Sequence, residues 1–460
     1  MCTRKGAIWL DSKMVEIFVD AMGLKAIYDK YDNIQRQVIK DIITLPIRHG
    51  GFGIHSAQRT SSAAYIGSIA LCAHTIVDMV PLLNTENGKE KWRAYKIYSA
   101  VANDFKDRLG KAFERWKNSP DIILTEAMVG IQGGMMEYVS KQVRESHNQR
   151  FEGAPSVGIQ TMSHAPFAER VLRTQSFTST NYITSGWLYA NPSHPHLRMN
   201  NTAFRLGVKQ RLLISVLDGR PFCKCGEVMD PMAQHPWLCR ESTTSGKFRN
   251  GAHAHLKRRL IEVINDSIKG TDYNVQLTEP AVEDYFHRVP PENRQNGCQR
   301  RDTTSEDIIR RADISIVSEK QDKPAILIDV TMTSSVGTSR GDMAYKRIGC
   351  KATARERQKY TNYKRDFDID DTTRAHLFFF GVETMGAFGA EAQRFCSLLA
   401  KIAGGPVGQR ITHIYQRLSV MLQGMRGFHI NSALLHYTSE TGRRENGVDR
   451  AIARRDVVAV

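Results

Sequence analysis

Cysteine is scarce in this chain, and its distribution is uneven. Only 8 of the 460 residues are cysteines, too few for the disulfide framework of a small secreted protein. Three of them, Cys223, Cys225 and Cys239, lie close together. This clustering favours a metal site in a reducing compartment.

The sequence also shows no pattern typical of a secretory leader or of a membrane span. Met1-Cys-Thr-Arg-Lys runs into Asp11 and Lys13 without the charged-then-apolar pattern of a signal peptide. The longest uncharged run, Thr60 to Val77, is rich in Ser, Ala and Gly, so a buried helix pair is expected there. We therefore expect an intracellular protein, nuclear or cytoplasmic, that is not secreted and has no membrane partner.

Acidic residues are too few to balance the basic ones. The chain has 48 Asp and Glu against 64 Lys and Arg, a formal net charge of +16. Such an excess favours a polyanionic partner. The hydrophobic content of 41% and charged content of 24% are ordinary for a globular protein. The length predicts two to four domains.

The first half of the chain has a mainly helical pattern. An apolar stripe with helical spacing consists of Val15, Phe18, Val19, Met22, Leu24 and Ile27. The turn-rich segment from Leu45 to Ile54 must end this helical region, and helix resumes at Ser56. From about residue 84 to 200 the pattern is mixed, and after Gly427 a polar, basic tail is expected.

The clustered cysteines belong to a Cys-x-Cys-x9-His-x3-Cys pattern. It is formed by Cys223, Cys225, His235 and Cys239. Zinc prefers four tetrahedral thiolate or imidazole ligands, and Gly226 suits a tight turn. The sequence therefore predicts a structural Zn²⁺ site, with a chance cluster of buried thiols as the alternative. His253 and His255 follow, but single histidines are usually not ligands, so neither is included.

An amphipathic helix is predicted behind the zinc pattern. Its apolar face consists of Leu256, Leu260, Val263, Ile264 and Ile268. Lys257, Arg258 and Arg259 would then be exposed and suited to contact phosphates.

Two aspartates flank a predicted β-hairpin. The run from Asp313 to Val317 alternates with period two, and Ala325-Ile-Leu-Ile328 is a short apolar strand. In an antiparallel hairpin, Asp313 and Asp329 come to the same end. Neighbouring carboxylates repel, and a bridging Mg²⁺ would relieve that repulsion, bind a phosphodiester oxygen and lower the pKa of a water. The alternative is that both residues only terminate strands.

Such a metal site also needs a cation. The residue two positions after Asp329 is not a lysine. The helix predicted from Ala344 to Tyr363 contains three lysines, at positions 346, 351 and 359. Glu279 is a possible additional carboxylate. Thr331 is expected only to continue the strand.

Four segments in order resemble the C-terminal part of a non-LTR retrotransposon polyprotein with a restriction-enzyme-like endonuclease. Leu45-Pro-x4-Gly-Gly-Phe-Gly-Ile54 and the following Ser56–Ser68 resemble the thumb region of its reverse transcriptase. The zinc pattern resembles its zinc knuckle. Arg311-Ala-Asp-Ile-Ser-Ile and Ile328-Asp-Val-Thr331 resemble its nuclease core. Lys359-Tyr360 and Phe378–Ala392 resemble the helix and closing strand of that core.

Departures from the family pattern are also present. Ala312 stands where the family usually has proline, and the histidine that commonly follows an arginine is displaced, in Arg249-Asn-Gly-Ala-His253. No Tyr-x-Asp-Asp polymerase motif occurs. The chain therefore resembles a fragment or shortened product without the polymerase palm.

The resemblance implies a multidomain α+β protein: a helical N-terminal half, a small zinc knuckle and a restriction-endonuclease-like α/β core. We expect a thumb-like region at 1–85, a helical linker at 86–204, the knuckle at 205–255, the nuclease at 256–425 and a basic tail at 426–460. It also implies nicking of target DNA to prime reverse transcription, with DNA and element RNA as partners. Asp313 and Asp329 would hold Mg²⁺, and Lys359, with Lys351 second, would be the catalytic lysine. A catalytically inactive nucleic-acid-binding remnant is the rival hypothesis.

Overall fold

The computed structural model forms two compact units, Met1–Gly158 and Ile159–Val460. It describes residues 4–58, 171–217, 230–235, 246–289, 310–336 and 347–441, apart from 173, 177, 277, 321 and 322. In both units together it has helices and one small mixed β-sheet, which confirms a mixed α+β fold. The expected helix after Ser56 lies almost entirely outside the described residues.

The described part of the first unit is helical, as predicted. It contains α1 (Arg4–Ala21), α2 (Lys25–Tyr28), α3 (Asn33–Thr44) and the short 3-10 helix η1 (Ile47–His49). The turn-rich segment follows α3 directly, and its backbone approaches itself so closely that a Cβ on Gly51 would lie 1.9 Å from the Leu45 carbonyl oxygen. The segment then returns to α1, where the buried Asp11 accepts hydrogen bonds from Ser56 and the Ala57 amide.

The sheet of the second unit has four strands in sequential order. They are β1 (Tyr273–Gln276), β2 (Ile314–Ser318), β3 (Ala325–Thr333) and β4 (Ala375–Glu383). The first three strands are antiparallel, and β4 pairs with β3 in parallel. The hairpin prediction is therefore confirmed. Asp329, however, lies within β3 and not at its end, because pairing with β4 continues to Thr333.

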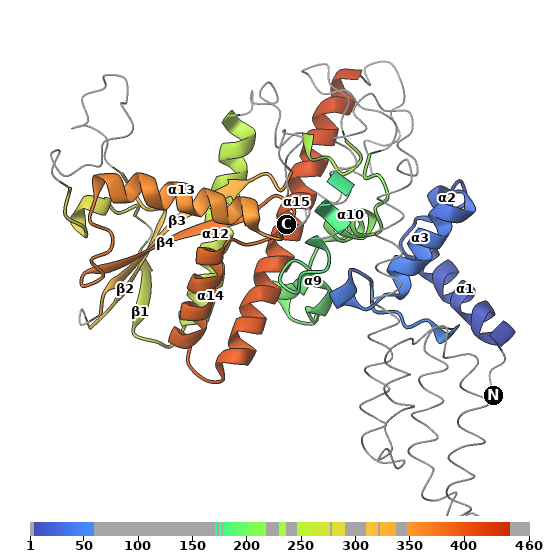
Figure 1. Ribbon diagram of the computed structural model, residues 1–460, viewed down its shortest axis with the longest axis horizontal. Coiled ribbons are helices and arrows are strands. Elements are labelled where there is room, and N and C mark those ends of the chain that lie inside the picture. Colours follow the sequence, from blue (N-terminus) through green and yellow to red (C-terminus); the bar gives the residue numbers. More distant parts are fainter. Residues whose placement is uncertain are drawn as a thin grey trace, which may run out of the picture. The chain divides into compact units, whose positions relative to one another are not determined.

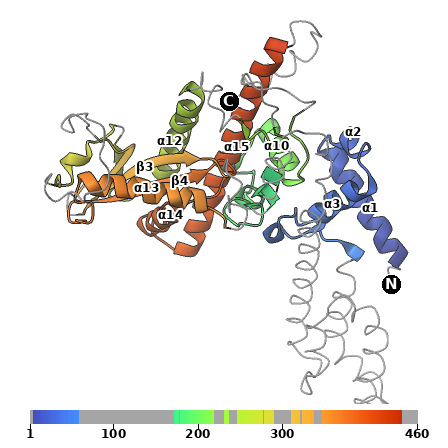
Figure 2. The same cartoon turned by 45° about the horizontal axis from the view of Figure 1, so that its top comes forward.

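Helices cover both faces of this sheet (Figures 1 and 2). One face packs against α12 (Gly246–Ile268), α14 (Ala390–Ile402) and α15 (Val407–Thr441), through alternate strand residues such as Ile328 and Phe378. The other face packs against α13 (Cys350–Asp366), where Tyr363 contacts Phe379. The amphipathic helix predicted over 256–268 is confirmed, since its apolar residues belong to this core.

Two element boundaries differ from the predictions. The helix expected from Ala344 begins only at Cys350, because Gly349 adopts φ +74° and its backbone lies against the Phe388 carbonyl. The expected tail after residue 425 begins inside α15, which continues to Thr441.

Smaller elements pack along α15. They are α9 (Gly186–Tyr189), the 3-10 helix η4 (Pro195–Leu197) and α10 (Asn201–Arg211), and a further 3-10 helix, η5 (Val282–Asp284), lies ahead of β2. No helix in the described ranges is both long and apolar enough to span a bilayer.

Candidate functional site

The strand register brings Asp313 and Asp329 together. Ile314 pairs with Ile328 across β2 and β3, and the Asp313 amide donates to the Ile328 carbonyl at 2.9 Å. One Asp313 carboxylate oxygen accepts the Val330 amide at 2.7 Å. The two carboxylates are close enough to influence each other's pKa. The hairpin thus places both aspartates at one site, as its predicted geometry requires.

Lys359 lies on the same site. Its ammonium nitrogen is 2.6 Å from Asp329 Oδ1 and 3.2 Å from the Val330 carbonyl oxygen. Lys351 is in the first turn of α13, where its backbone amide donates to Glu383 at 2.9 Å. Lys346 is outside the described residues. Of the predicted lysines, the structure thus brings Lys359 to the carboxylates.

His253 is a site residue that the sequence did not identify as one. Its Nε2 lies 3.4 Å from Asp313 Oδ2 and 3.1 Å from the Val330 carbonyl oxygen. It reaches the site from α12, whose helical core residues begin immediately after it. The signal available in the sequence was its position just ahead of the predicted amphipathic helix.

The two carboxylates have opposite electrostatic environments. Burial strongly disfavours the charged form of Asp329, and with the neighbouring Asp313 it raises the Asp329 pKa despite Lys359. Burial also opposes ionisation of Asp313, but the hydrogen bond and charge of His253, together with the Val330 amide, oppose that effect, and the Asp313 pKa is lowered. The hydrogen bond to Asp313 in turn raises the pKa of His253. The environment therefore favours ionisation of Asp313 and disfavours ionisation of Asp329.

Tyr363 forms the inner wall beside Asp329. Burial first, and then the Asp329 charge, raises its pKa well above the usual range, so its hydroxyl stays protonated. The Arg310 guanidinium lies over its ring at 5.1 Å and pairs with Asp366 at 2.7 Å. These contacts fix the ring at the same end of the hairpin as the carboxylates.

Two buried glutamates hold α13 in place. Glu356, on α13, accepts hydrogen bonds from the amides of Gly381, Glu391 and Ala392, each at 3.0 Å. Glu383, at the end of β4, accepts from the first amides of α13. Each carboxylate thereby satisfies the unpaired amides at a helix start. Lys359 is therefore presented by a helix that is anchored at both of these points.

The oxygen donors at this site suit a hard divalent cation. Two carboxylates and the Val330 carbonyl face one another, and Mg²⁺ typically uses one or two carboxylates and several waters. Among the residues that the structure describes, no three His, Cys, Asp or Glu side chains gather into a metal-binding group. A cation here would thus depend on the aspartate pair, a backbone oxygen and water.

Other predicted residues lie outside this group. Thr331 is buried and continues β3, as expected. Glu279 forms an ion pair with Lys257, which lies one helical turn after His253. The Glu279 side chain is about half exposed. Arg259 pairs with Glu262 at 2.9 Å. Of the three basic residues expected to be exposed on α12, Arg258 is exposed, whereas Lys257 and Arg259 are partly buried, so the prediction is wrong for those two.

The zinc pattern is only partly described. Cys223, Cys225 and Cys239 lie outside the described residues. His235 donates its amide to the buried Asp230 at 2.6 Å. Val216 donates to the Pro231 carbonyl at 2.9 Å, joining the two ends of the segment that contains the first two cysteines.

Gln234, the neighbour of His235, is hydrogen-bonded to the end of the sheet. The buried Thr384, directly after β4, donates from its hydroxyl to Gln234 at 2.9 Å, and the Ser335 amide donates to that hydroxyl. His235 therefore follows a residue that is fixed to the sheet. No protein-family model matches the chain, and no curated protein sequence is significantly similar to it.

Proposed function

We propose that this chain is the endonuclease-bearing C-terminal part of a non-LTR retrotransposon protein, and that it nicks target DNA in a Mg²⁺-dependent hydrolysis that primes reverse transcription. The observation that carries the proposal is the meeting of Asp313, Asp329 and Lys359. These residues come from two strands and a helix that are distant in sequence. Their types and their order along the chain match those of restriction-type nucleases.

The arrangement of elements supports a restriction-endonuclease-like core. An antiparallel hairpin carries the carboxylates, α13 crosses from β3 to the parallel strand β4, and helices lie on both faces (Figure 1). The lysine is on the crossover helix and not on β3. In this arrangement the lysine reaches the aspartates across the sheet face.

Each residue of the site would have its own role in the reaction. A divalent cation held by Asp313 and Asp329 would bind a phosphodiester oxygen and lower the pKa of the attacking water. Lys359 would move from Asp329 toward the scissile phosphate and stabilise the charge that develops there. His253 orients Asp313 through its Nε2. The buried Tyr363 hydroxyl, which stays protonated, interacts with Asp329.

The same proposal includes the partners and the second metal. Cys223, Cys225, His235 and Cys239 would hold a structural Zn²⁺, and the +16 charge would favour DNA and element RNA. Action on genomic DNA would require the protein to enter the nucleus after its synthesis in the cytoplasm.

A plasmid assay tests the proposal. Purified chain, supercoiled plasmid and Mg²⁺ should give nicked circles, and EDTA should prevent them. Ca²⁺ should support DNA binding but little cutting, because its larger and looser coordination sphere positions the water poorly. Binding without nicking in Mg²⁺ and in Mn²⁺ would contradict the proposal.

The second candidate function is a nucleic-acid-binding remnant without catalysis. Ala312, fully buried beside Asp313, replaces the family's usual proline, and no polymerase motif accompanies the nuclease-like core. The remnant hypothesis predicts DNA binding whose affinity is unchanged by substitutions at Asp313 and Asp329, with no nicking under any metal.

A further inference from the structure

The flank of α13 that carries Lys359 is basic. Lys351, Arg355 and Lys359 occupy every fourth position of this helix. Residues at this spacing lie on one side of a helix, with their Cβ atoms about 5–6 Å apart. At a rise of about 1.5 Å per residue, the three positions extend over about 12 Å. We call this set the basic row. It ends at the carboxylate site, because the Lys359 ammonium nitrogen lies 2.6 Å from Asp329 Oδ1.

The basic row leads from the carboxylate site to the surface. The buried residues of α13 are Ala352, Glu356 and Tyr363, whereas Arg355 is exposed. At about 100° per residue, Arg355 lies about 40° from Lys359 around the helix axis, on the side away from the three buried residues. Arg355 is therefore the first accessible cation of the row beyond Lys359.

No carboxylate on this part of α13 neutralises Arg355. The only acidic residue between Cys350 and Asn362 is Glu356, which is buried and accepts hydrogen bonds from three backbone amides. Arg355 donates to the Gln358 side chain and forms no ion pair in the part of the chain that the structure describes. A guanidinium has five N–H donors, so this single contact leaves donors for a phosphate.

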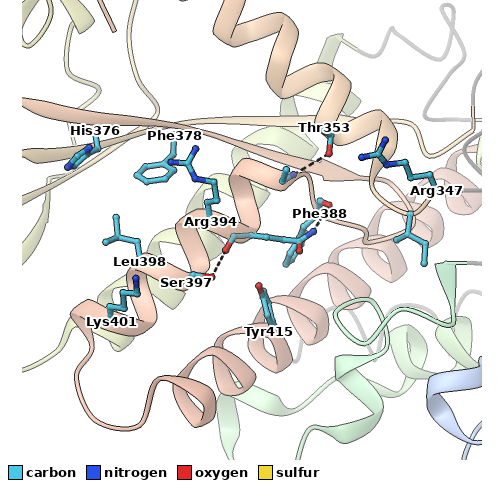
Figure 3. A pocket seen from close by; sticks show the side chains of 13 residues that line it. Arg347, Thr353, His376, Phe378, Phe388, Arg394, Ser397, Leu398, Lys401 and Tyr415 are labelled. Atoms are coloured by element: carbon cyan, nitrogen blue, oxygen red, sulfur yellow. Dashed lines mark hydrogen bonds between the residues drawn. The ribbon is translucent and has the colours of Figure 1, made fainter. Parts of the chain in front are cut away.

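The opposite flank of α13 faces α14 and not the carboxylates. Thr353 points toward α14, where its hydroxyl accepts the Ala390 amide at 3.2 Å (Figure 3). Arg357 is four residues after Thr353 and is therefore on this flank. It is also exposed, and it has no ion pair with any described residue. Arg355 and Arg357 thus share residue type, helix and exposure but occupy different flanks.

The length and charge of the basic row suit one strand of duplex DNA. Each strand carries one negative charge per about 3.4 Å of helix axis, so a row of about 12 Å faces about three phosphates. In the proposed reaction the scissile phosphate lies beside Lys359. The neighbouring phosphates of the same strand then pass along the flank that contains Arg355.

We propose that Arg355 binds the phosphate next to the scissile one, and that the basic row holds the cut strand of duplex DNA, with Lys351 at its outer end. This inference rests on the proposed function, since the nicked strand must enter the site at Lys359. The contact exists equally in the bound substrate and in the transition state, so its loss should weaken binding without slowing the chemical step.

Fluorescence anisotropy with a short labelled DNA duplex in EDTA measures this binding apart from nicking. Arg355→Gln should weaken the affinity by about fivefold and reduce the slope of log Kd against log salt concentration by about 1, as expected for one lost phosphate contact. Arg357→Gln is the charge-matched control and should change the affinity by less than about twofold. Arg355→Lys keeps the charge and should retain most of the affinity. Since both arginines are exposed, the melting temperatures of all variants should match that of the unsubstituted chain.

Plasmid nicking in Mg²⁺ separates strand binding from catalysis. Arg355→Gln should raise KM and leave kcat unchanged, and a lower kcat at unchanged KM would contradict the proposed role. Equal weakening of duplex binding by Arg355→Gln and Arg357→Gln, or none by Arg355→Gln, would overturn the proposal even where the unsubstituted chain nicks plasmid. Selective weakening by Arg355→Gln in a chain that does not nick would support the basic row and contradict only the proposed function.

Discussion

Asp329 is buried and faces the Asp313 carboxylate, so its pKa is raised even though the Lys359 ammonium lies 2.6 Å away. A pair of carboxylates in one buried site is unfavourable unless cations compensate it. His253 compensates Asp313, and Lys359 compensates Asp329 only in part. This residual conflict is the reason that we infer a divalent cation at the site.

Lys359→Ala should lower the nicking rate by about 100-fold, a typical loss when one group that stabilises the transition state is removed. DNA affinity should change little, since one phosphate contact at most is lost. Lys364→Ala is the matched control, because Lys364 is on the same helix and pairs with the exposed Asp370. An unchanged nicking rate in Lys359→Ala would remove this lysine from the site.

His429 should make the fold sensitive to acid. Burial first, and then the nearby His255, lowers its pKa from 6.5 to about 4. The unfolded chain therefore takes up a proton that the folded chain does not, and the stability gained above pH 6.5 is lost as the pH falls toward about 4. Because the side chain is nearly inaccessible, this loss is on the order of 3 kcal/mol.

Thermal denaturation of the wild type and His429→Gln between pH 7 and pH 4 measures this effect. The two melting temperatures should converge as the pH falls. Parallel curves across the whole range would show that His429 does not titrate differently in the folded and unfolded states.

At the scale of elements, the position of α13 depends on two carboxylates that no local pattern indicates. Glu356 and Glu383 cap helix starts that are distant in sequence. Space for Glu356 depends on Gly389, since a Cβ there would lie 2.2 Å from the carboxylate. The helix that carries Lys359 is thus fixed by tertiary contacts.

Gly389→Ala should therefore destabilise the second unit by about 1–3 kcal/mol, the range for overpacking a buried site. Gly424→Ala is the matched control. Gly424 is within α15, and a Cβ added to it would meet open space, so alanine there should stabilise by roughly 0.5–1 kcal/mol. Thermal denaturation should move the two variants in opposite directions, and a shared direction would contradict the packing argument.

The sequence was sufficient to predict the features that follow from the spacing of apolar residues along the chain. The alternation after Asp313 and the apolar run before Asp329 predicted the hairpin, and the hairpin predicted the carboxylate pair. It was insufficient where a contact joins distant segments. His253 has no periodic signal for its contact with Asp313, and the start of α13 depends on Gly349 and a cap from β4.

At the scale of the whole molecule, the zinc pattern and the sheet belong to the same compact unit. Thr384 joins Gln234 to the end of β4, so His235 has a fixed support. In the proposed function, the chain's +16 charge would provide sequence-independent attraction to nucleic acid. Specific chemistry would come from the small aspartate site.

The purified protein should contain about one zinc ion per chain, as expected for one closed tetrahedral site. Cys225→Ser should lose this zinc and weaken nucleic-acid binding, while the sheet stays folded, because no described residue between 205 and 235 belongs to the core that packs on the sheet. Elemental analysis of folded protein measures the stoichiometry. Folded, unsubstituted protein without zinc would remove the knuckle from the account.

Nicking of supercoiled plasmid by Asp329→Ala, in parallel with the unsubstituted chain, tests the central claim most directly. The matched control is Asp368→Ala, since Asp368 is exposed. We predict that Mg²⁺ supports nicking by the unsubstituted chain and by Asp368→Ala, and that Asp329→Ala binds the plasmid with similar affinity but does not nick it. Equal nicking by Asp329→Ala, or none by the unsubstituted chain in Mg²⁺ and Mn²⁺, would contradict the account.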